Sequence, residues 1–415
     1  MYVLTAKEMQ SIDHYTIQNL GISQEILMEK AALCAVEEIM KLYPHNVICV
    51  CGNGNNGGDG IAVARILKMK GIRAAVYLCS DKTLCKPSVQ KQLSLFERIG
   101  GVVTKEPDFD DYDVIVDAIF GIGLSRNICE PFASVIQNIA TASAKESTKV
   151  ISLDIPSGIN TDTGAVMNVA VKADITIAFA YAKRGHLLYP GRSYCGELLI
   201  KDAGMYLDYS ELKDRIIGTF FANPKECKLP VTKITANKGT QGRILVIAGS
   251  DSMYGACYLS SAAAFYMGCG LVDIYTTSDN IRLLKTILPE AIYYCMDSEC
   301  QNFDVLKTLT ERASCVIIGP GISTSGFAHD LVTFTLNNCH KPIVLDADAI
   351  NCIADNTNAF YQILNNRNTP VIMTPHPKEL SRFLHKDCEE VLSDYTEYLT
   401  STARAQQLII VGKGA

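Results

Sequence analysis

Three features are scarce or missing in this 415-residue sequence, and each absence excludes a class of protein. No C-x-x-C pair occurs, which excludes the usual zinc sites built from paired cysteines. No uninterrupted apolar run reaches the length of a membrane-spanning helix. The formal net charge is only −6, without the basic excess typical of proteins that bind nucleic acid. We therefore expect neither a membrane nor nucleic acid as a partner.

Cysteine is plentiful, with 16 residues, but the pattern does not predict disulfides. A disulfide scaffold is typically short and secreted. Residues 1–8 also lack the apolar segment of a signal peptide. We expect reduced, mostly buried thiols in a cytoplasmic protein.

The length and composition predict two globular domains, because 415 residues exceed one ordinary hydrophobic core. Apolar runs alternate with helical patterns, which favours parallel sheets flanked by helices in both halves. The expected strands are Val47–Cys51, Ala74–Leu78, Val114–Asp117, Val150–Asp154, Ile175–Phe179, Arg243–Ala248, Leu271–Thr276, Cys315–Ile318, Ile343–Asp346, Val371–Thr374 and Leu408–Val411. A polar stretch at about 208–238 indicates the junction, so we expect domains at 1–215 and 216–415.

The run Gly52–Gly60, G-N-G-N-N-G-G-D-G, lies between an expected strand and an expected helix. Glycines let backbone N–H groups approach a phosphate closely, and the N-terminus of a helix adds partial positive charge. The run matches the dinucleotide pattern G-x-G-x-x-G, which is a weak signal alone. Its polar Asn55, Asn56 and Asp59 are unusual for a dehydrogenase loop, and an acid facing a pyrophosphate is repulsive unless a cation intervenes.

Three more loops follow expected strand ends, where open α/β sheets bind ligands. They contain Asp117, Asp154 and the run Tyr181–Gly185. Each acid has an alternative as a cap of a strand or helix end. A dehydrogenase also stays open, with Asp81 as its acid near the second expected strand. The gathering of several acids and amides at one sheet edge is hard to explain by capping alone.

These motifs resemble the NAD(P)H-hydrate epimerase family over residues 1–215. The resemblance is carried by Gly52–Gly60, by Asp117 with Gly121–Arg126, and by the D-I-P-S-G run Asp154–Gly158. It implies a Rossmann-like, doubly wound parallel sheet. It also implies interconversion of the R and S C6-hydrates of NADH and NADPH, called NADHX and NADPHX.

The same resemblance implies the roles of individual residues. Asp154 would be the acid/base, with Lys183 as its electrostatic partner or else a solvated lysine. A potassium ion would be held by Asn56, Asp117 and Ser157, and hard cations do prefer oxygen ligands. The substrate would contact Asn55, Asn56, Gly57, Gly58, Asp59, Gly121, Ile122, Gly123, Leu124, Ser125, Arg126, Asn127 and Asp154.

The second half resembles the ADP-dependent NAD(P)H-hydrate dehydratase family, which has a ribokinase-like α/β fold. The resemblance lies in the runs Lys238–Gly242, Gly319–Gly321, Leu345–Ala349 and Thr374–Glu379. It implies removal of water from the S hydrate with ADP or ATP as cosubstrate. Ala256, Gly321 and His376 would line the hydrate site, and Lys413, Gly414 and Ala415 would begin the nucleotide loop. Taken alone, Gly319–Gly321 could be a tight turn and His376 a packed loop histidine.

The sequence departs from that family at its end, because no G-x-G-D run follows Lys413. That run supplies the anion hole and the catalytic acid, so we expect residues 1–415 to epimerise but not to dehydrate. The expected function is repair of a small-molecule dinucleotide, in a homo-oligomer. Two alternatives stay open: an ordinary nicotinamide dehydrogenase and a catalytically silent nucleotide-binding scaffold.

Overall fold

The computed structural model describes the chain except residues 1, 146, 207–218, 221–233, 297–302 and 415. It divides into two compact units, Met1–Cys227 and Lys228–Ala415, each with its own sheet and core. The boundary expected at residue 215 lies outside the described residues, as do most of the expected junction and Ala415. Every cysteine among the described residues is a free thiol. No helix in the described part of the chain is long and apolar enough to cross a membrane.

The first unit is built on a seven-stranded sheet whose strands are all parallel. In spatial order the strands are β4 (Val102–Thr104), β3 (Arg73–Leu78), β2 (Asn46–Cys51), β5 (Val114–Ala118), β6 (Lys149–Leu153), β7 (Ile175–Phe179) and β9 (Glu197–Lys201). The helices are α1 (Ala6–Gln18), α2 (Gln24–Met40), α3 (Asn55–Met69), α4 (Pro87–Arg98) and α5 (Phe132–Ser143). The strand order reverses between β2 and β5, and ligands bind at such a reversal in open α/β sheets.

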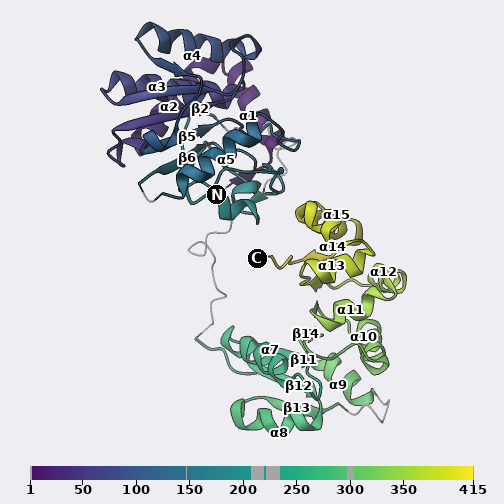
Figure 1. Ribbon diagram of the computed structural model, residues 1–415. Coiled ribbons are helices and arrows are strands. Elements are labelled where there is room, and N and C mark those ends of the chain that lie inside the picture. The colour runs from purple at the N-terminus through teal and green to yellow at the C-terminus, as the bar shows by residue number, and fades with distance from the viewer. Residues whose placement is uncertain (1, 146, 207–218, 221–233, 297–302, 415) are drawn as a thin grey trace. The chain divides into compact units, whose positions relative to one another are not determined.

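Successive side chains of β2 point to opposite faces of the sheet, and each face packs against its own layer of helices. Cys49 and Cys51 pack into a core with α2, α3 and α4, whereas Ile48 and Val50 pack into a second core with α5. Figure 1 shows α2, α3 and α4 on one side of this sheet and α5 on the other. A strand buried on both faces is apolar at every position, which is why the run 47–51 has no polar residue.

The N-terminus of the first unit joins a small separate sheet. Its strands are β10 (Thr219–Phe220), β1 (Tyr2–Leu4) and β8 (Ala182–Lys183), with β1 in the centre. A capping box then starts α1: the N–H of Glu8 donates to Thr5 Oγ1, and the N–H of Thr5 donates to Glu8 Oε2 at 2.7 Å. Helix α1 therefore begins at a fixed point beside β8, which carries Lys183.

The second unit has its own seven-stranded, all-parallel sheet. In spatial order its strands are β13 (Ile292–Cys295), β12 (Leu271–Thr276), β11 (Arg243–Ile247), β14 (Cys315–Ile318), β15 (Ile343–Leu345), β16 (Val371–Met373) and β17 (Ile409–Ile410). Its helices are α7 (Tyr254–Tyr266), α8 (Ser278–Ile287), α9 (Asp304–Arg312), α10 (Gly326–Asn338), α11 (Asp348–Ala354), α12 (Thr357–Asn365), α13 (Pro377–Leu384), α14 (Cys388–Ser393) and α15 (Tyr395–Gln406). The expected α/β class is confirmed for both units.

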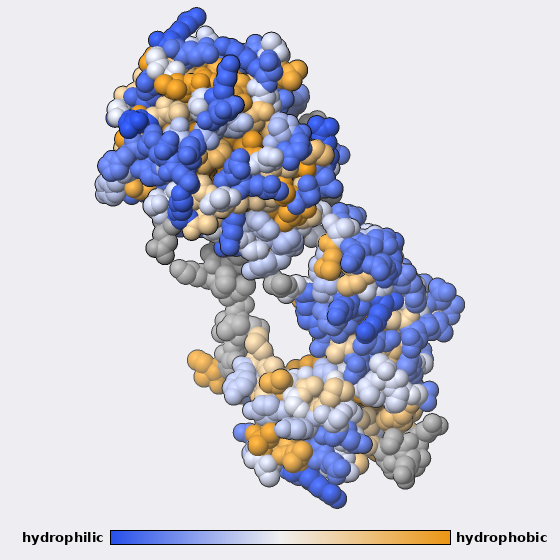
Figure 2. All heavy atoms as spheres, in the orientation of Figure 1, coloured by the Kyte–Doolittle hydropathy of each residue, from blue (hydrophilic) through white to orange (hydrophobic). Residues whose placement is uncertain are grey.

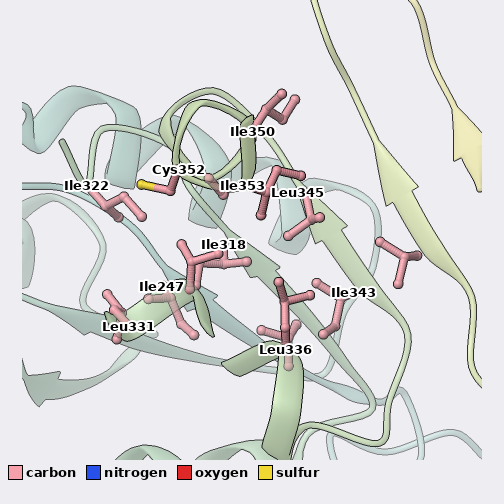
Figure 3. Packing of buried hydrophobic residues seen from close by; sticks show 14 of the residues in the cluster. Ile247, Ile318, Ile322, Leu331, Leu336, Ile343, Leu345, Ile350, Cys352 and Ile353 are labelled. Atoms are coloured by element: carbon pink, nitrogen blue, oxygen red, sulfur yellow. The ribbon is translucent and has the colours of Figure 1, made fainter. Parts of the chain in front are cut away.

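The largest core of the second unit lies between its sheet and the helices α10, α11 and α13. Figure 3 shows Ile247, Ile318 and Leu345 from neighbouring strands meeting Leu331, Leu336 and Ile353 from helices. Outside this core, several large apolar side chains of α7 and α8 are exposed, and Figure 2 shows apolar residues gathered at that end of the unit. The expected homo-oligomer stays a prediction.

Candidate active site

A cavity of about 540 Å³ opens at the carboxyl edge of β2, β5 and β6. The loops after these three strands form one side of it, α1 and α2 form much of the other, and Lys86, Phe179 and Met205 complete the lining. Its polar and charged lining side chains are Gln10, Asp13, Gln24, Asn53, Asn55, Asn56, Asp59, Lys86, Ser125, Arg126 and Asp154. The cavity therefore lies where the glycine loop and the strand-end acids were expected to meet.

Most of the residues expected to contact substrate line this cavity. They are Asn55, Asn56, Asp59, Gly121, Ile122, Gly123, Leu124, Ser125, Arg126 and Asp154. Gly57 and Gly58 are instead buried at the start of α3. A Cβ on Gly57 would lie 2.0 Å from the carbonyl oxygen of Gly52, and one on Gly58 would meet Met28. Asn127, at the end of its loop, is exposed.

Asp154 and Lys183 form a close ion pair at one wall of the cavity. The Lys183 ammonium donates to Asp154 Oδ1 and, at 3.0 Å, to the carbonyl oxygen of Phe179. The Lys183 side chain is fully buried, whereas the Asp154 side chain is 15% exposed. Lys183 is therefore not a solvated surface lysine, and its ammonium is directed to the Asp154 carboxylate at the cavity wall.

The backbone is strained directly after β6, at Asp154, and directly after β7, at Ala180, three residues before Lys183. Asp154 has φ +65° and Ala180 has φ +61°, although neither is glycine. Each is the centre of a three-residue turn: the N–H of Ile155 donates to Leu153 O, and the N–H of Tyr181 donates to Phe179 O, both at 2.8 Å. Such backbone strain costs about 1–3 kcal/mol per residue and is commonly found at active sites.

Asn56, Asp117 and Ser157 meet beneath the cavity. The fully buried Asp117 accepts hydrogen bonds from Ser157 N and Ser152 Oγ at 2.8 Å and from Ser157 Oγ at 2.5 Å. Asn56 Nδ2 donates to the carbonyl of Phe120 at 2.8 Å, which leaves Asn56 Oδ1 buried without a hydrogen-bond partner. The Ser157 hydroxyl also donates to the Phe120 carbonyl, at 3.3 Å, so this carbonyl connects Asn56 with Ser157. A buried amide oxygen without a partner suits a hard cation.

Three lining residues of α1 and one that directly precedes α4 were not expected from the sequence. They are Met9, Gln10, Asp13 and Lys86. The helical pattern predicts α1 but does not indicate which sheet edge the helix covers, so no signal in the sequence points to Asp13. Burial and the nearby Asp154 carboxylate raise the pKa of Asp13 above its ordinary value of 3.8.

Asp59 is a second acid of this cavity whose pKa is raised. Burial first, and then the carboxylates of Asp154 and Asp13, raise the pKa of Asp59 well above its ordinary value of 3.8. The folded protein therefore holds the Asp59 proton to a higher pH than the unfolded chain does. The stabilisation from Asp59 is complete below the unfolded pKa and declines as pH rises through the raised folded pKa.

We therefore expect Asp59→Asn to raise the melting temperature at pH 7–8, with a gain that shrinks toward pH 4. Ionisation of Asp59 above pH 4 favours the unfolded chain, and the neutral amide removes this effect. Each 1 kcal/mol gained shifts the melting temperature by roughly 2–4 °C in a domain of this size. Calorimetry over this pH range measures the effect, with the exposed Asp81→Asn as the matched control. A lower melting temperature for Asp59→Asn at pH 8 would contradict the expectation.

In the second unit, Ala256 and Gly321 lie against each other. Ala256 is in the first turn of α7, and Gly321 follows β14 with φ +68°. A Cβ on Gly321 would approach the Ala256 Cβ to 3.1 Å, so this left-handed turn must pass close to the helix. His376 lies at another strand end, after β16, where its Nδ1 accepts from the N–H groups of Lys378 and Glu379 and caps α13.

Lys413 joins the ends of β15 and β17. Its ammonium donates to Asp346 Oδ1 at 2.7 Å, and Asp346 Oδ1 also accepts from Thr374 Oγ1 at 2.6 Å. Glu379 lies 3.8 Å from the same ammonium. The expected nucleotide-loop residue thus contacts residues of the Leu345–Ala349 and Thr374–Glu379 runs. A Cβ on Gly414 would have no neighbouring atom within 4 Å, and Ala415 lies outside the described residues.

The fold and the site define a two-unit α/β protein whose glycine loop matches the dinucleotide-binding pattern. The polar residues Asn55, Asn56 and Asp59 inside that loop are unusual for a dehydrogenase. Two family models match the chain: "YjeF-related protein N-terminus" at residues 24–185 and "NAD(P)H-hydrate dehydratase" at residues 244–415. The bifunctional NAD(P)H-hydrate repair enzyme Nnr of Coxiella burnetii is 31% identical over 418 residues, which cover 98% of this chain and 81% of that protein. The chain belongs to the family of bifunctional NAD(P)H-hydrate repair enzymes.

Each half also matches proteins that contain one unit alone. The NAD(P)H-hydrate epimerase of Limosilactobacillus fermentum is 40% identical over 202 residues, which cover 48% of this chain and 95% of that protein. A crystal structure of the ADP/ATP-dependent NAD(P)H-hydrate dehydratase of Bacillus subtilis, obtained with ATP/Mg²⁺, matches with 32% identity and a TM-score of 0.38. That match covers 45% of this chain and 62% of the Bacillus chain.

Proposed function

We propose that the cavity of the first unit epimerises the R and S forms of NADHX and NADPHX, with Asp154 moving the proton. The observation that carries this proposal is the Asp154–Lys183 pair, in which a buried ammonium faces the partly exposed carboxylate at the cavity wall. The glycine loop and Gly121–Arg126 on the neighbouring wall bind the dinucleotide. The alternative function, a nicotinamide dehydrogenase, would instead use Asp81 as its acid. Asp81 is exposed in this structure and does not line the cavity.

The chemistry requires a proton at the C6 hydroxyl. That hydroxyl leaves as water when it receives a proton, and water returns to the opposite face of the ring when its extra proton is removed. Asp154 is held by the Lys183 ammonium at the wall of the cavity, where its carboxylate is placed to remove that proton. Asp59, kept neutral by burial and by the neighbouring carboxylates, is the matching donor in the same cavity.

We also propose that Asn56, Asp117 and Ser157 hold a potassium ion. The unpaired Asn56 Oδ1 supports this site, since a bound cation would satisfy it. A cation here supplies positive charge near the anionic substrate and relieves the repulsion expected from the acids of the loop. Asp117 takes part as a ligand and not as a proton donor.

Potassium should stabilise the first unit relative to a large organic cation at equal ionic strength. We expect a gain of about 1–3 kcal/mol when potassium is present at 10–100 times its dissociation constant. Thermal unfolding in potassium and in tetramethylammonium chloride measures it, and Ser157→Ala should lose most of the difference. Equal melting temperatures of the wild-type protein in both salts would contradict the proposed potassium site.

For the second unit we propose, as an activity of the complete domain, the dehydration of the S hydrate at the expense of ADP or ATP. Lys413 with Asp346 supports a nucleotide site at the ends of β15 and β17, and Ala256 with Gly321 supports the hydrate site. An assay with and without nucleotide separates the two activities. Residues 1–415 should interconvert the epimers of NADHX without any nucleotide, and the expectation from the sequence is that they form no NADH when ADP or ATP is added. Nucleotide-dependent formation of NADH at a rate comparable to epimer exchange would contradict that expectation.

A further inference from the structure

His186 connects the two residues of the proposed acid/base pair through their backbones. It lies in the 3₁₀ turn η3 (Arg184–His186), directly after Lys183, and is fully buried. Its Nδ1 accepts a hydrogen bond of 3.1 Å from the N–H of Lys183. Its Nε2 lies 2.7 Å from the carbonyl oxygen of Asp154. One imidazole therefore contacts the backbones of both Lys183 and Asp154, the two residues of the ion pair.

The partners of the ring define its protonation. Because Nδ1 accepts from a backbone N–H, it carries no proton, and Nε2 must carry the proton that it donates to the Asp154 carbonyl. Burial, followed by the charge of Lys183, lowers the pKa of His186 to about 3. The ring stays neutral at neutral pH, so both hydrogen bonds are kept in the range where the enzyme works.

The bond to Asp154 acts on a strained residue. Asp154 has φ +65°, and its flanking residues close the tight turn by the bond from Ile155 N to Leu153 O. The N–H of Asp154 is fixed by the carbonyl of Ile177 at 2.8 Å. The carbonyl of Asp154 is fixed by His186. With both peptide groups held, the direction of the Cα–Cβ bond, and hence of the carboxylate, is set by the backbone.

We propose that His186 is a positioning residue for epimerisation: its Nε2–H holds the strained turn at Asp154 and so keeps the carboxylate aimed into the cavity. This inference rests on the proposed role of Asp154 in proton transfer. His186 itself does not line the cavity and moves no proton.

Two substitutions separate the two hydrogen bonds of the ring. In His186→Gln, the side-chain amide nitrogen can take the place of Nε2 and keep the donation to Asp154 O, while the acceptor for Lys183 N–H is lost. In His186→Asn, the amide oxygen can take the place of Nδ1, but the side chain is too short to reach Asp154 O. Each variant loses one buried hydrogen bond, so the two are matched for stability.

We expect His186→Asn to lower kcat for epimer exchange by about 10–100-fold with KM changed less than about threefold, because a misaimed carboxylate affects the reacting step. His186→Gln should retain kcat within about threefold. Melting temperatures of the two variants should fall by similar amounts. Equal values of kcat in the two variants, or full kcat in His186→Asn, would overturn the positioning role.

Two controls keep the outcome interpretable. Asp154→Asn is assayed beside these variants: if it retains exchange, the role of Asp154 and the positioning role fail together. If it is inactive while folded His186→Asn keeps full kcat, only the positioning role fails. Nitrogen-15 NMR of the wild-type protein tests the ring without any substitution. We expect a neutral His186 protonated at Nε2 from about pH 5 to 8, and a charged or Nδ1-protonated ring would overturn the proposal.

Discussion

Asp154→Asn should lower the rate of epimer exchange by about 100-fold or more, the usual scale for loss of a general acid/base. The amide keeps the size of the side chain and can still accept from the Lys183 ammonium, but it cannot remove a proton. Kinetics with purified R- and S-NADHX measure the loss, and circular dichroism shows whether the protein is folded. Stability should also fall, because the variant leaves a buried ammonium without its ionised partner.

The matched control for this prediction is Asp81→Asn. Asp81 is an exposed acid that follows β3 and caps a short turn through Thr83 N at 2.8 Å. In the dehydrogenase alternative Asp81 would bind the cofactor, whereas in the epimerase it is outside the cavity. We expect its substitution to leave exchange unchanged. Near-normal exchange in folded Asp154→Asn would remove Asp154 from the mechanism.

Gly57→Ala should damage both stability and activity of the first unit. Its Cβ would lie 2.0 Å from the carbonyl oxygen of Gly52, which is backbone and cannot rotate away. Such overpacking typically costs about 1–3 kcal/mol or more. The shift should also displace Asn55, Asn56 and Asp59, and a misplacement of about 1 Å can reduce a rate by about 10²-fold.

Gly54→Ala provides the control within the same loop. No neighbouring atom lies within 4 Å of a Cβ at Gly54, and its φ of −92° is open to any residue. Differential scanning calorimetry and the exchange assay on both variants distinguish a close-packing requirement from a general intolerance of the loop. Equal melting temperatures for the two variants would show that the tight contact at Gly57 does not matter.

The strands that position the site could be predicted because they are buried on both faces. Expected Val47–Cys51 and Ile175–Phe179 match β2 and β7 to within one residue. The outer strands β4, β9 and β13 were not predicted; each lies at a sheet edge, and its residues are exposed or only partly buried.

Within the candidate site, the sequence indicated the loops but not the elements that close over them. Asp154, Asp59 and Arg126 belong to motifs at strand ends, where parallel sheets bind ligands, and all three line the cavity. Asp13 comes from a helix more than a hundred residues away from Asp154, and only tertiary packing brings them together. His186 lies three residues after Lys183 in the sequence, but its role depends on a left-handed turn that no local pattern predicts.

The most direct test of the central claim is the exchange of pure S-NADHX by the purified protein without ADP or ATP, followed by chromatographic separation of the two epimers. The account predicts that R-NADHX forms at a rate proportional to protein concentration until the epimers reach equilibrium, and that Asp154→Asn removes this acceleration. Formation of R-NADHX no faster with the wild-type protein than in buffer alone would contradict the account.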